Sequence, residues 1–310
     1  MSEEENTAVE RLKVVLHSFY TDGRKKGLGM TPRPGDVFIC TSPKAGTTWM
    51  QQICHQLRTR GNMDFEEISS VVPWLETCED IGVDVNADQI TPRLFKTHAW
   101  KPHLLDGKGI SEECKYILIT RNPEDSAVSF YNFLNGWFFA KNSISIERFM
   151  DELFLKRGRP KSIMNNPSYW EFLLSWWPNR NDPNVLWLWY EDMKEDHKAT
   201  VIKVAEFLGY DCKDAELIDI AYKNSTFDFM KEHEVKFDEH TWKQHNNVRC
   251  SLSPDAGLNS SKVMNGGRHP KPKLSTETLT QLDLKWKEVV TAQTGFASYD
   301  EMRKSFSVFK

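Results

Sequence analysis

Residues 42–48, SPKAGTT, combine side chains suited to holding an anion. Lys44 supplies a mobile positive charge, and Gly46 lets the backbone approach a ligand closely. The hydroxyl groups of Thr47 and Thr48 can donate hydrogen bonds to phosphate or sulfate oxygens. The segment differs from the phosphate-binding pattern G-x-x-x-x-G-K-[ST], because its Lys precedes the Gly and no leading Gly is present. An anion site is therefore predicted, with a tight turn capped by a Thr as the alternative.

Further polar side chains end two other apolar segments. Lys96 and His98 end the segment 93–98, and Arg121 ends 114–121; Ser129 follows eight residues after Arg121. Each could be a helix cap or half of a surface ion pair. Because the carboxyl ends of parallel strands meet at one edge of a sheet, we expect these side chains to gather beside the anion loop. With an ordinary pKa of about 6.5, His98 could take a proton from a hydroxyl group.

The elements that must position these residues alternate between strands and helices. Continuous apolar runs are typical of strands buried on both faces of a parallel sheet. The predicted strands are 36–41, 93–98, 114–121 and 185–190, and the predicted helices are 47–59, 123–135 and 195–208. This alternation predicts an α/β fold, a central parallel sheet flanked by helices, in which the anion loop joins the first strand to the first helix.

We expect one domain over residues 1–310, a length sufficient for a single large core. The segment 1–30 is predicted to be peripheral. Residues 231–273 are polar and lack periodicity, so they are predicted to be irregular and to form a lid over the site.

Composition excludes several classes of protein. The net charge is −4, which gives no electrostatic case for binding nucleic acid. No apolar run approaches the ~18 residues of a membrane span, and the acidic start of the chain is unlike a secretory signal. The six cysteines are scattered without C-x-x-C spacing, so we expect reduced thiols in a cytoplasmic protein. No cluster of metal ligands is apparent, and no metal is expected.

Several ordered motifs between about residues 30 and 270 resemble those of the cytosolic sulfotransferase family. Members of that family transfer a sulfuryl group from 3′-phosphoadenosine 5′-phosphosulfate (PAPS) to a small acceptor. SPKAGTTW (42–49) resembles the family's 5′-phosphosulfate loop, and RNPEDSAVSFY (121–131) resembles its 3′-phosphate motif. KTH (96–98) matches the strand end that carries the catalytic His. The lesser matches are VPWLE (72–76), YEDM (190–193) and STFDFMK (225–231).

The resemblance implies a cofactor site. Lys44, Gly46, Thr47 and Thr48 would hold the 5′-phosphosulfate, with Trp49 near the adenine. Arg121 and Ser129 would bind the 3′-phosphate. The implied cofactor-binding residues are Lys44, Ala45, Gly46, Thr47, Thr48, Trp49, Arg121, Ser129, Tyr190, Ser225, Phe227, Gly266, Gly267 and Arg268.

The resemblance also implies roles in catalysis and in acceptor binding. His98 would be the general base, with Lys96 beside it and Lys44 neutralising the leaving phosphate. Trp74, Phe133 and His98 would line the acceptor pocket, and Phe138, within GWFF (136–139), would form its rim.

The sequence departs from the family pattern in three places. Ala45 replaces a Ser; the backbone N–H remains, but a hydroxyl that could engage Lys44 is lost. In the late glycine-rich motif Gly266 and Gly267 are kept, while the preceding Arg-Lys pair is replaced; Arg268 could restore a phosphate contact. The family's dimerisation motif is not recognisable, which leaves the oligomeric state open.

Two other functions compete with sulfuryl transfer. A nucleotide kinase would need Mg²⁺ and a Ser or Thr directly after the loop Lys, where this chain has Ala45. A catalytically silent nucleotide-binding protein would not need His98. The acceptor, a small molecule with a hydroxyl or an amine, is not specified by the sequence.

Overall fold

A four-stranded parallel sheet forms the centre of the computed structural model, which describes residues 3–17, 21–257, 262–263 and 273–307. The strand order is β2-β1-β3-β4, and all three neighbouring pairs are parallel. The strands are β1 (Val37–Thr41), β2 (Leu94–Thr97), β3 (Lys115–Thr120) and β4 (Val185–Trp189). The four predicted strands and the parallel α/β fold are confirmed.

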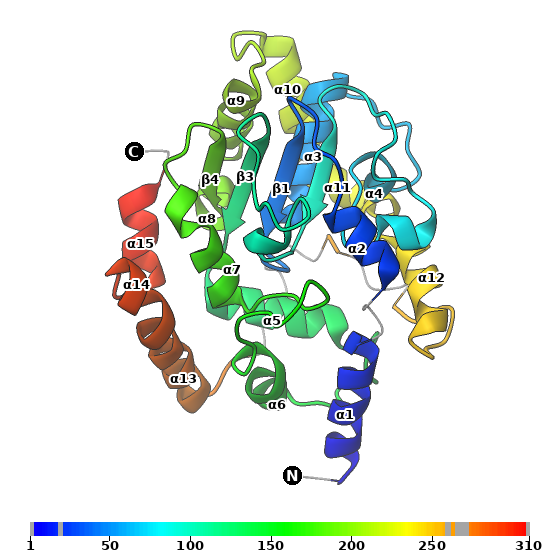
Figure 1. The fold of residues 1–310 in the computed structure, drawn as a ribbon, viewed down its shortest axis with the longest axis vertical. Coiled ribbons are helices and arrows are strands. Elements are labelled where there is room, and N and C mark those ends of the chain that lie inside the picture. The colour runs from blue at the N-terminus through cyan, green and yellow to red at the C-terminus, as the bar shows by residue number, and fades with distance from the viewer. Residues whose placement is uncertain (1–2, 18–20, 258–261, 264–272, 308–310) are drawn as a thin grey trace.

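Helices cover both faces of the sheet and the carboxyl ends of its strands (Figure 1). In chain order they are α1 (Glu3–His17), α2 (Asp22–Leu28), α3 (Thr47–Thr59), α4 (Ile68–Val71), α5 (Pro123–Leu134), α6 (Ile146–Phe149), α7 (Tyr169–Trp176), α8 (Tyr190–Glu195), α9 (His197–Leu208), α10 (Ala215–Lys223), α11 (Phe227–Glu232), α12 (His240–Arg249), α13 (Thr276–Trp286), α14 (Ala292–Thr294) and α15 (Tyr299–Phe306). Short 3-10 or π turns lie at Cys78–Ile81, Lys101–His103, Met150–Phe154, Trp177–Asn179, Glu234–Phe237 and Lys287–Thr291.

Local sequence signals set the helix boundaries nearest the site. Helix α3 begins directly after Gly46, and α5 begins at Pro123, with the Asn122 side chain accepting hydrogen bonds from the first turn. The single helix predicted over 195–208 is wrong at its start. Asp196 separates α8 from α9 and caps α9 by accepting a hydrogen bond from the N–H of Ala199.

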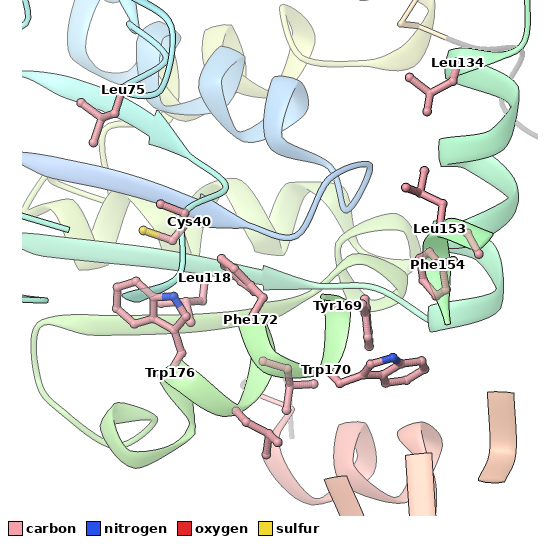
Figure 2. Close-up of a cluster of buried hydrophobic side chains, with 14 of the residues drawn as sticks. Cys40, Leu75, Leu118, Leu134, Leu153, Phe154, Tyr169, Trp170, Phe172 and Trp176 are labelled. Atoms are coloured by element: carbon pink, nitrogen blue, oxygen red, sulfur yellow. The ribbon is translucent and has the colours of Figure 1, made fainter. Parts of the chain in front are cut away.

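Two apolar layers sandwich the sheet. On one face, α7 places Phe172 and Trp176 toward Cys40 and Leu118 of the sheet (Figure 2). On the other face, residues of α3, α9 and α10 pack against the opposite side chains of the strands. Both faces of the strands are therefore buried, as their continuous apolar runs predict.

The N-terminal segment belongs to the core. Val9, Leu12 and Val15 of α1 are buried in the same cluster as the sheet. Gly27 of α2 lies so close to the carbonyl of Leu75 that a Cβ atom would be 1.7 Å from its oxygen. The expectation that 1–30 is peripheral is therefore wrong for these residues.

The segment 231–273 is only partly irregular. The helix α12, His240–Arg249, contradicts the expectation there, and Trp242, Asn246 and Asn247 on it are buried. Gly266, Gly267 and Arg268 lie outside the described residues. The lid remains a prediction.

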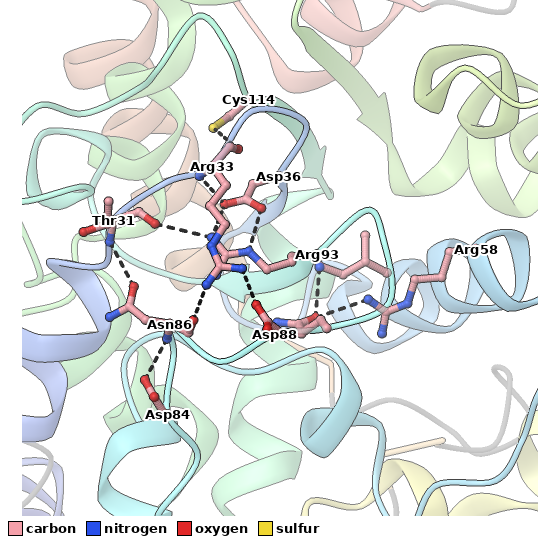
Figure 3. A network of polar contacts seen from close by, with 11 residues as sticks. Thr31, Arg33, Asp36, Arg58, Asp84, Asn86, Asp88, Arg93 and Cys114 are labelled. Carbon is pink, nitrogen blue, oxygen red and sulfur yellow. Dashed lines mark hydrogen bonds and ion pairs between the residues drawn. The ribbon is translucent and has the colours of Figure 1, made fainter.

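The amino ends of β1 and β2 carry a network of paired charges (Figure 3). Arg93 donates two hydrogen bonds to the carboxylate of Asp36, at 2.9 and 2.6 Å, and both side chains are buried. The exposed Arg33 pairs with Asp88 at 2.6 Å. The carboxylates of Asp36 and Asp88 each have an arginine partner, so these pairs connect the segments at the amino ends of the strands.

Candidate functional site

A cavity of about 540 Å³ opens at the carboxyl ends of the strands. It is lined by fifteen of the predicted site residues: Lys44, Gly46, Thr47, Thr48, Trp49, Trp74, Lys96, His98, Arg121, Ser129, Phe133, Phe138, Tyr190, Ser225 and Phe227. Ala45 is not among the lining residues. Its methyl group is buried, and its N–H donates to the carbonyl of Ser42 at 3.3 Å. The expected gathering of strand-end residues beside the anion loop is present.

The anion loop is held in an unusual backbone conformation. Lys44 has φ 69° and Gly46 has φ 104°. A Cβ atom on Gly46 would lie 2.9 Å from the ring of Tyr190, so glycine meets both the backbone and the packing requirement there. Arg121 donates a hydrogen bond to the carbonyl of Lys44 at 3.0 Å and stacks on Tyr190 at 4.4 Å. The turn after β3 thus fixes the loop after β1.

Cations predominate around Lys44. Its Nζ lies 4.1 Å from the centre of the Phe133 ring, and the Nζ of Lys262 lies 5.8 Å from the same ring. Burial, with the charges of Lys262 and Arg121, lowers the pKa of Lys44 to about 7. Among the described residues, no carboxylate lies within ion-pair distance of Lys44 or Arg121, and the buried Nε of Arg121 has no hydrogen-bond partner. An anion fits such a site.

The ring of His98 is oriented by the end of β1. The carbonyl of Thr41 lies 2.9 Å from Nδ1 and can only accept, so Nδ1 carries the proton and Nε2 carries the lone pair. The N–H of His98 donates to the buried Glu76 at 2.6 Å. Burial and the charge of Lys96 lower the pKa of His98 to about 3, so the expected ordinary value is wrong for the protein without cofactor. At neutral pH the imidazole is neutral, as a base must be.

A buried carboxylate holds the predicted catalytic Lys96. Glu239 pairs with both Lys96 and Lys262, and it accepts a hydrogen bond from Ser69 at 3.0 Å. Lys96 also lies 4.8 Å from the Trp74 ring. Burial lowers the pKa of Lys96 well below its ordinary value, and Glu239 holds the Lys96 side chain beside His98.

Several of the predicted nucleotide-binding residues come together in the cavity. The indole N–H of Trp49 donates to the carbonyl of Ser225 at 2.8 Å, and its ring meets that of Tyr190 at 5.9 Å. Phe227 and Ser129 line the same cavity from α11 and α5. Segments separated by more than 170 residues in the chain thus form one aromatic and cationic pocket.

Comparison with known proteins identifies the chain. The sequence family described as the sulfotransferase domain matches residues 34–288. This chain belongs to the sulfotransferase family. The prediction of a sulfotransferase is therefore confirmed, and a kinase is not favoured.

Individual relatives agree with this assignment. Sulfotransferase 1E1 of Mus musculus is 33% identical over 205 residues, covering 64% of this chain and 67% of the relative. An amine sulfotransferase of Oryctolagus cuniculus is 34% identical over 203 residues, covering 64% of each chain. Among solved structures, retinol dehydratase bound to androsterone and the inactive cofactor PAP superposes with a TM-score of 0.70 at 17% identity, covering 97% of both chains. A mouse sulfotransferase complexed with PAP superposes with a TM-score of 0.61 at 21% identity, covering 93% of this chain and 95% of that one.

Several residues of the cavity wall were not predicted from the motifs in the sequence. Glu76 ends the VPWLE motif, so its position could have suggested a role. Arg24 and Trp242 line the cavity from α2 and α12, and Glu239 precedes α12. These three stand in segments that the sequence marked as peripheral or irregular, and no local pattern distinguishes them.

Two further observations concern the described part of this sulfotransferase. Among the residues described, no three His, Cys, Asp or Glu side chains are grouped so that they could hold a metal ion. No helix within the described ranges has the length and apolar character needed to cross a bilayer.

Proposed function

We propose that this sulfotransferase moves a sulfuryl group from PAPS to a hydroxyl or an amine of a small apolar acceptor. One observation carries the proposal. Lys44 and Arg121 have no carboxylate partner among the described residues, and both line the cavity. The same cavity is lined by His98, whose ring is oriented by the Thr41 carbonyl. Anion binding and proton removal are thus combined in one space.

The cavity residues fit the cofactor. Lys44, Thr47 and Thr48, with the first N–H groups of α3, would hold the 5′-phosphosulfate. Arg121, whose orphaned Nε can still donate, would hold the 3′-phosphate together with Ser129. When bound, PAPS supplies a sulfuryl group attached to a leaving phosphate. The Lys44 ammonium offsets the negative charge that grows on that phosphate.

Proton removal falls to His98. Its Nε2 accepts the proton of an acceptor hydroxyl, while Nδ1–H stays on the Thr41 carbonyl and keeps the ring aligned for in-line attack. Nearby negative charge favours the imidazolium, so the nucleotide would raise the low pKa of His98 toward the range of a useful base. Glu239 keeps the neighbouring Lys96 in place.

Aromatic side chains support an apolar acceptor. Trp74 meets His98 edge-on at 5.3 Å, and Phe133 and Phe138 line the same space. Solved structures of retinol dehydratase contain androsterone or retinol, and both of these ligands are apolar alcohols. One relative is an amine sulfotransferase, which favours testing amines too. All six cysteines are free thiols, which supports a cytoplasmic location.

Incubating the protein with labelled PAPS and a library of phenols, alcohols, steroids and amines tests the proposal. We expect sulfated product with at least one class, and a loss of ~10²–10³ in kcat/KM for Lys44→Ala. Lys115→Ala is the matched control, because Lys115 lies at the amino end of β3 and binds the carbonyl of Phe207. PAPS binding without transfer to any acceptor would indicate a silent binder. Binding of ATP with Mg²⁺ in place of PAPS would indicate a kinase.

A further inference from the structure

The C-terminal helix α15 packs beside β4 and α8, far along the chain from the anion loop (Figure 1). Tyr299, its first residue, is buried between aromatic rings, with Trp189 at 5.3 Å and Trp286 at 6.1 Å. Burial raises the pKa of Tyr299 well above its ordinary value, so the hydroxyl stays protonated and can donate. No motif of the sequence drew attention to this residue.

The carboxylate of Glu191 connects the Tyr299 hydroxyl to the turn that follows β3. It donates to Oε2 of Glu191, and it lies 3.4 Å from the carbonyl of Thr120 at the end of β3. The other oxygen of Glu191, Oε1, accepts the backbone N–H of Asn122 at 3.0 Å. Glu191 thus joins α15 to the turn between β3 and α5.

That turn carries the predicted 3′-phosphate ligands. Asn122 directly follows Arg121 and caps α5, the helix on which Ser129 stands. The carbonyl of Arg121 accepts a second buried tyrosine hydroxyl, from Tyr169, at 2.7 Å. The peptide between Arg121 and Asn122 is therefore clamped from both sides, by Tyr169 at its carbonyl and by Glu191 at its N–H.

We propose that Tyr299 is a positioning residue for the 3′-phosphate site. Its hydroxyl fixes Glu191, and Glu191 fixes the turn that aims Arg121 into the cavity. The inference rests on the proposed use of PAPS. It gives the C-terminal helix a part in cofactor selection, although no residue of α15 lines the cavity among the described residues.

A second set of contacts holds α15 to α8, and it allows the role of Tyr299 to be tested separately from the anchoring of the helix. Arg303 of α15 donates to Asp192 at 2.6 Å, and Ser307 donates to the same carboxylate at 2.7 Å. These bonds tie α15 to α8 without touching Glu191. We therefore expect Arg303→Gln to loosen the helix and to leave the hydrogen bond between Tyr299 and Glu191 in place, which makes it a matched control for Tyr299→Phe.

Calorimetric titration of 3′,5′-ADP and 5′-AMP into the full chain tests the proposal. Tyr299→Phe keeps the ring and removes one hydrogen bond to a charged group. We expect the Kd for 3′,5′-ADP to rise about 5-fold to 10-fold and the Kd for 5′-AMP to change less than about twofold. Arg303→Gln is expected to lower Tm and to leave the ratio of the two Kd values unchanged. Glu191→Gln, which leaves α15 intact, is expected to reproduce the selective loss if Tyr299→Phe does not fold.

The possible results distinguish a failure of this inference from a failure of the proposed use of PAPS. If the unaltered protein shows no preference for 3′,5′-ADP over 5′-AMP, the proposed use of PAPS is wrong, and this role of Tyr299 falls with it. If the preference exists and Tyr299→Phe retains it in full, only the positioning role is overturned. Equal losses for both nucleotides, or the same change in ratio with Arg303→Gln, would also overturn it, because they would show a general effect of the helix.

Discussion

The two ends of the central sheet differ in whether their charged side chains are paired. At the amino ends of the strands, the buried Arg93 and Asp36 form an ion pair in which Nη2 and Oδ2 are 2.6 Å apart (Figure 3). At the carboxyl ends, Lys44 and Arg121 crowd together with Lys262 nearby, and neither of the first two has a carboxylate partner among the described residues. The same strands thus end in a closed ion pair on one side and an open cluster of cations on the other.

This difference between the two ends separates charges that stabilise the fold from charges that are available to bind a ligand. A buried ion pair is costly to break, because removing one partner leaves the other charge buried without a counter-charge. A buried cation without a partner weakens the folded protein, and the lowered pKa of Lys44 records that cost. Such a cluster is explained most simply by an anion that completes it. Substitutions at the two ends should therefore fail in different assays.

The largest expected effect is loss of turnover at the carboxyl end. His98→Ala removes the only imidazole lining the cavity among the described residues and should lower kcat with a hydroxyl acceptor by ~10²–10⁴. Binding of 3′,5′-ADP should be nearly unchanged, because His98 is not a phosphate ligand. Steady-state kinetics and calorimetry measure the two quantities. His103→Ala is the control, since His103 packs against Trp100 outside the cavity lining. A normal kcat in His98→Ala would remove His98 from the mechanism.

At the amino end we expect loss of stability with activity retained. Asp36→Asn keeps the shape of the side chain and leaves the buried Arg93 guanidinium without its counter-charge, which should lower the free energy of unfolding by ~3–5 kcal/mol. The kcat of the folded fraction should be unchanged. Denaturant unfolding gives the stability. Asp88→Asn breaks an exposed pair and should cost under ~1 kcal/mol. Equal costs for the two variants would show that burial does not set the strength of this network.

The smallest expected effect is a gain in stability when a site cation is removed. The pKa of Lys44 is about 7 in the folded protein against an ordinary 10.5, so the unfolded chain binds the proton more tightly. Between these values stability rises with pH, and the penalty of burying the charge is full at or below about pH 7. Lys44→Met should therefore raise Tm by roughly 2–4 °C at pH 7, with a smaller gain near pH 10. A lower Tm at pH 7 would mean that Lys44 contributes to stability instead.

The sequence predicted what local patterns encode. Continuous apolar runs placed all four strands, and the change from the strand ending at Thr41 to the helix starting at Thr47 placed the anion loop between them. Because the parallel arrangement brings strand ends to one edge, the sequence alone predicts that His98 and Arg121 lie at a single site.

What the sequence did not predict depends on contacts between distant segments. Glu239 meets Lys96 across more than 140 residues of chain, and Tyr299 meets Glu191 across more than 100. Neither contact leaves a periodic or local signal. The low pKa of His98 has the same origin, because it follows from burial and from the neighbouring Lys96, which only the folded structure shows.

Proton uptake on nucleotide binding tests the central claim most directly. If an anion completes the cluster at the carboxyl ends, phosphates near Lys44 must raise its pKa above about 7. Calorimetry of 3′,5′-ADP binding at about pH 8, in buffers of different ionisation enthalpy, should then show net proton uptake that is reduced in Lys44→Ala. Affinity should also fall as the pH rises from about 7 to 9. Absence of binding, or binding with no proton uptake and no pH dependence, would contradict the account.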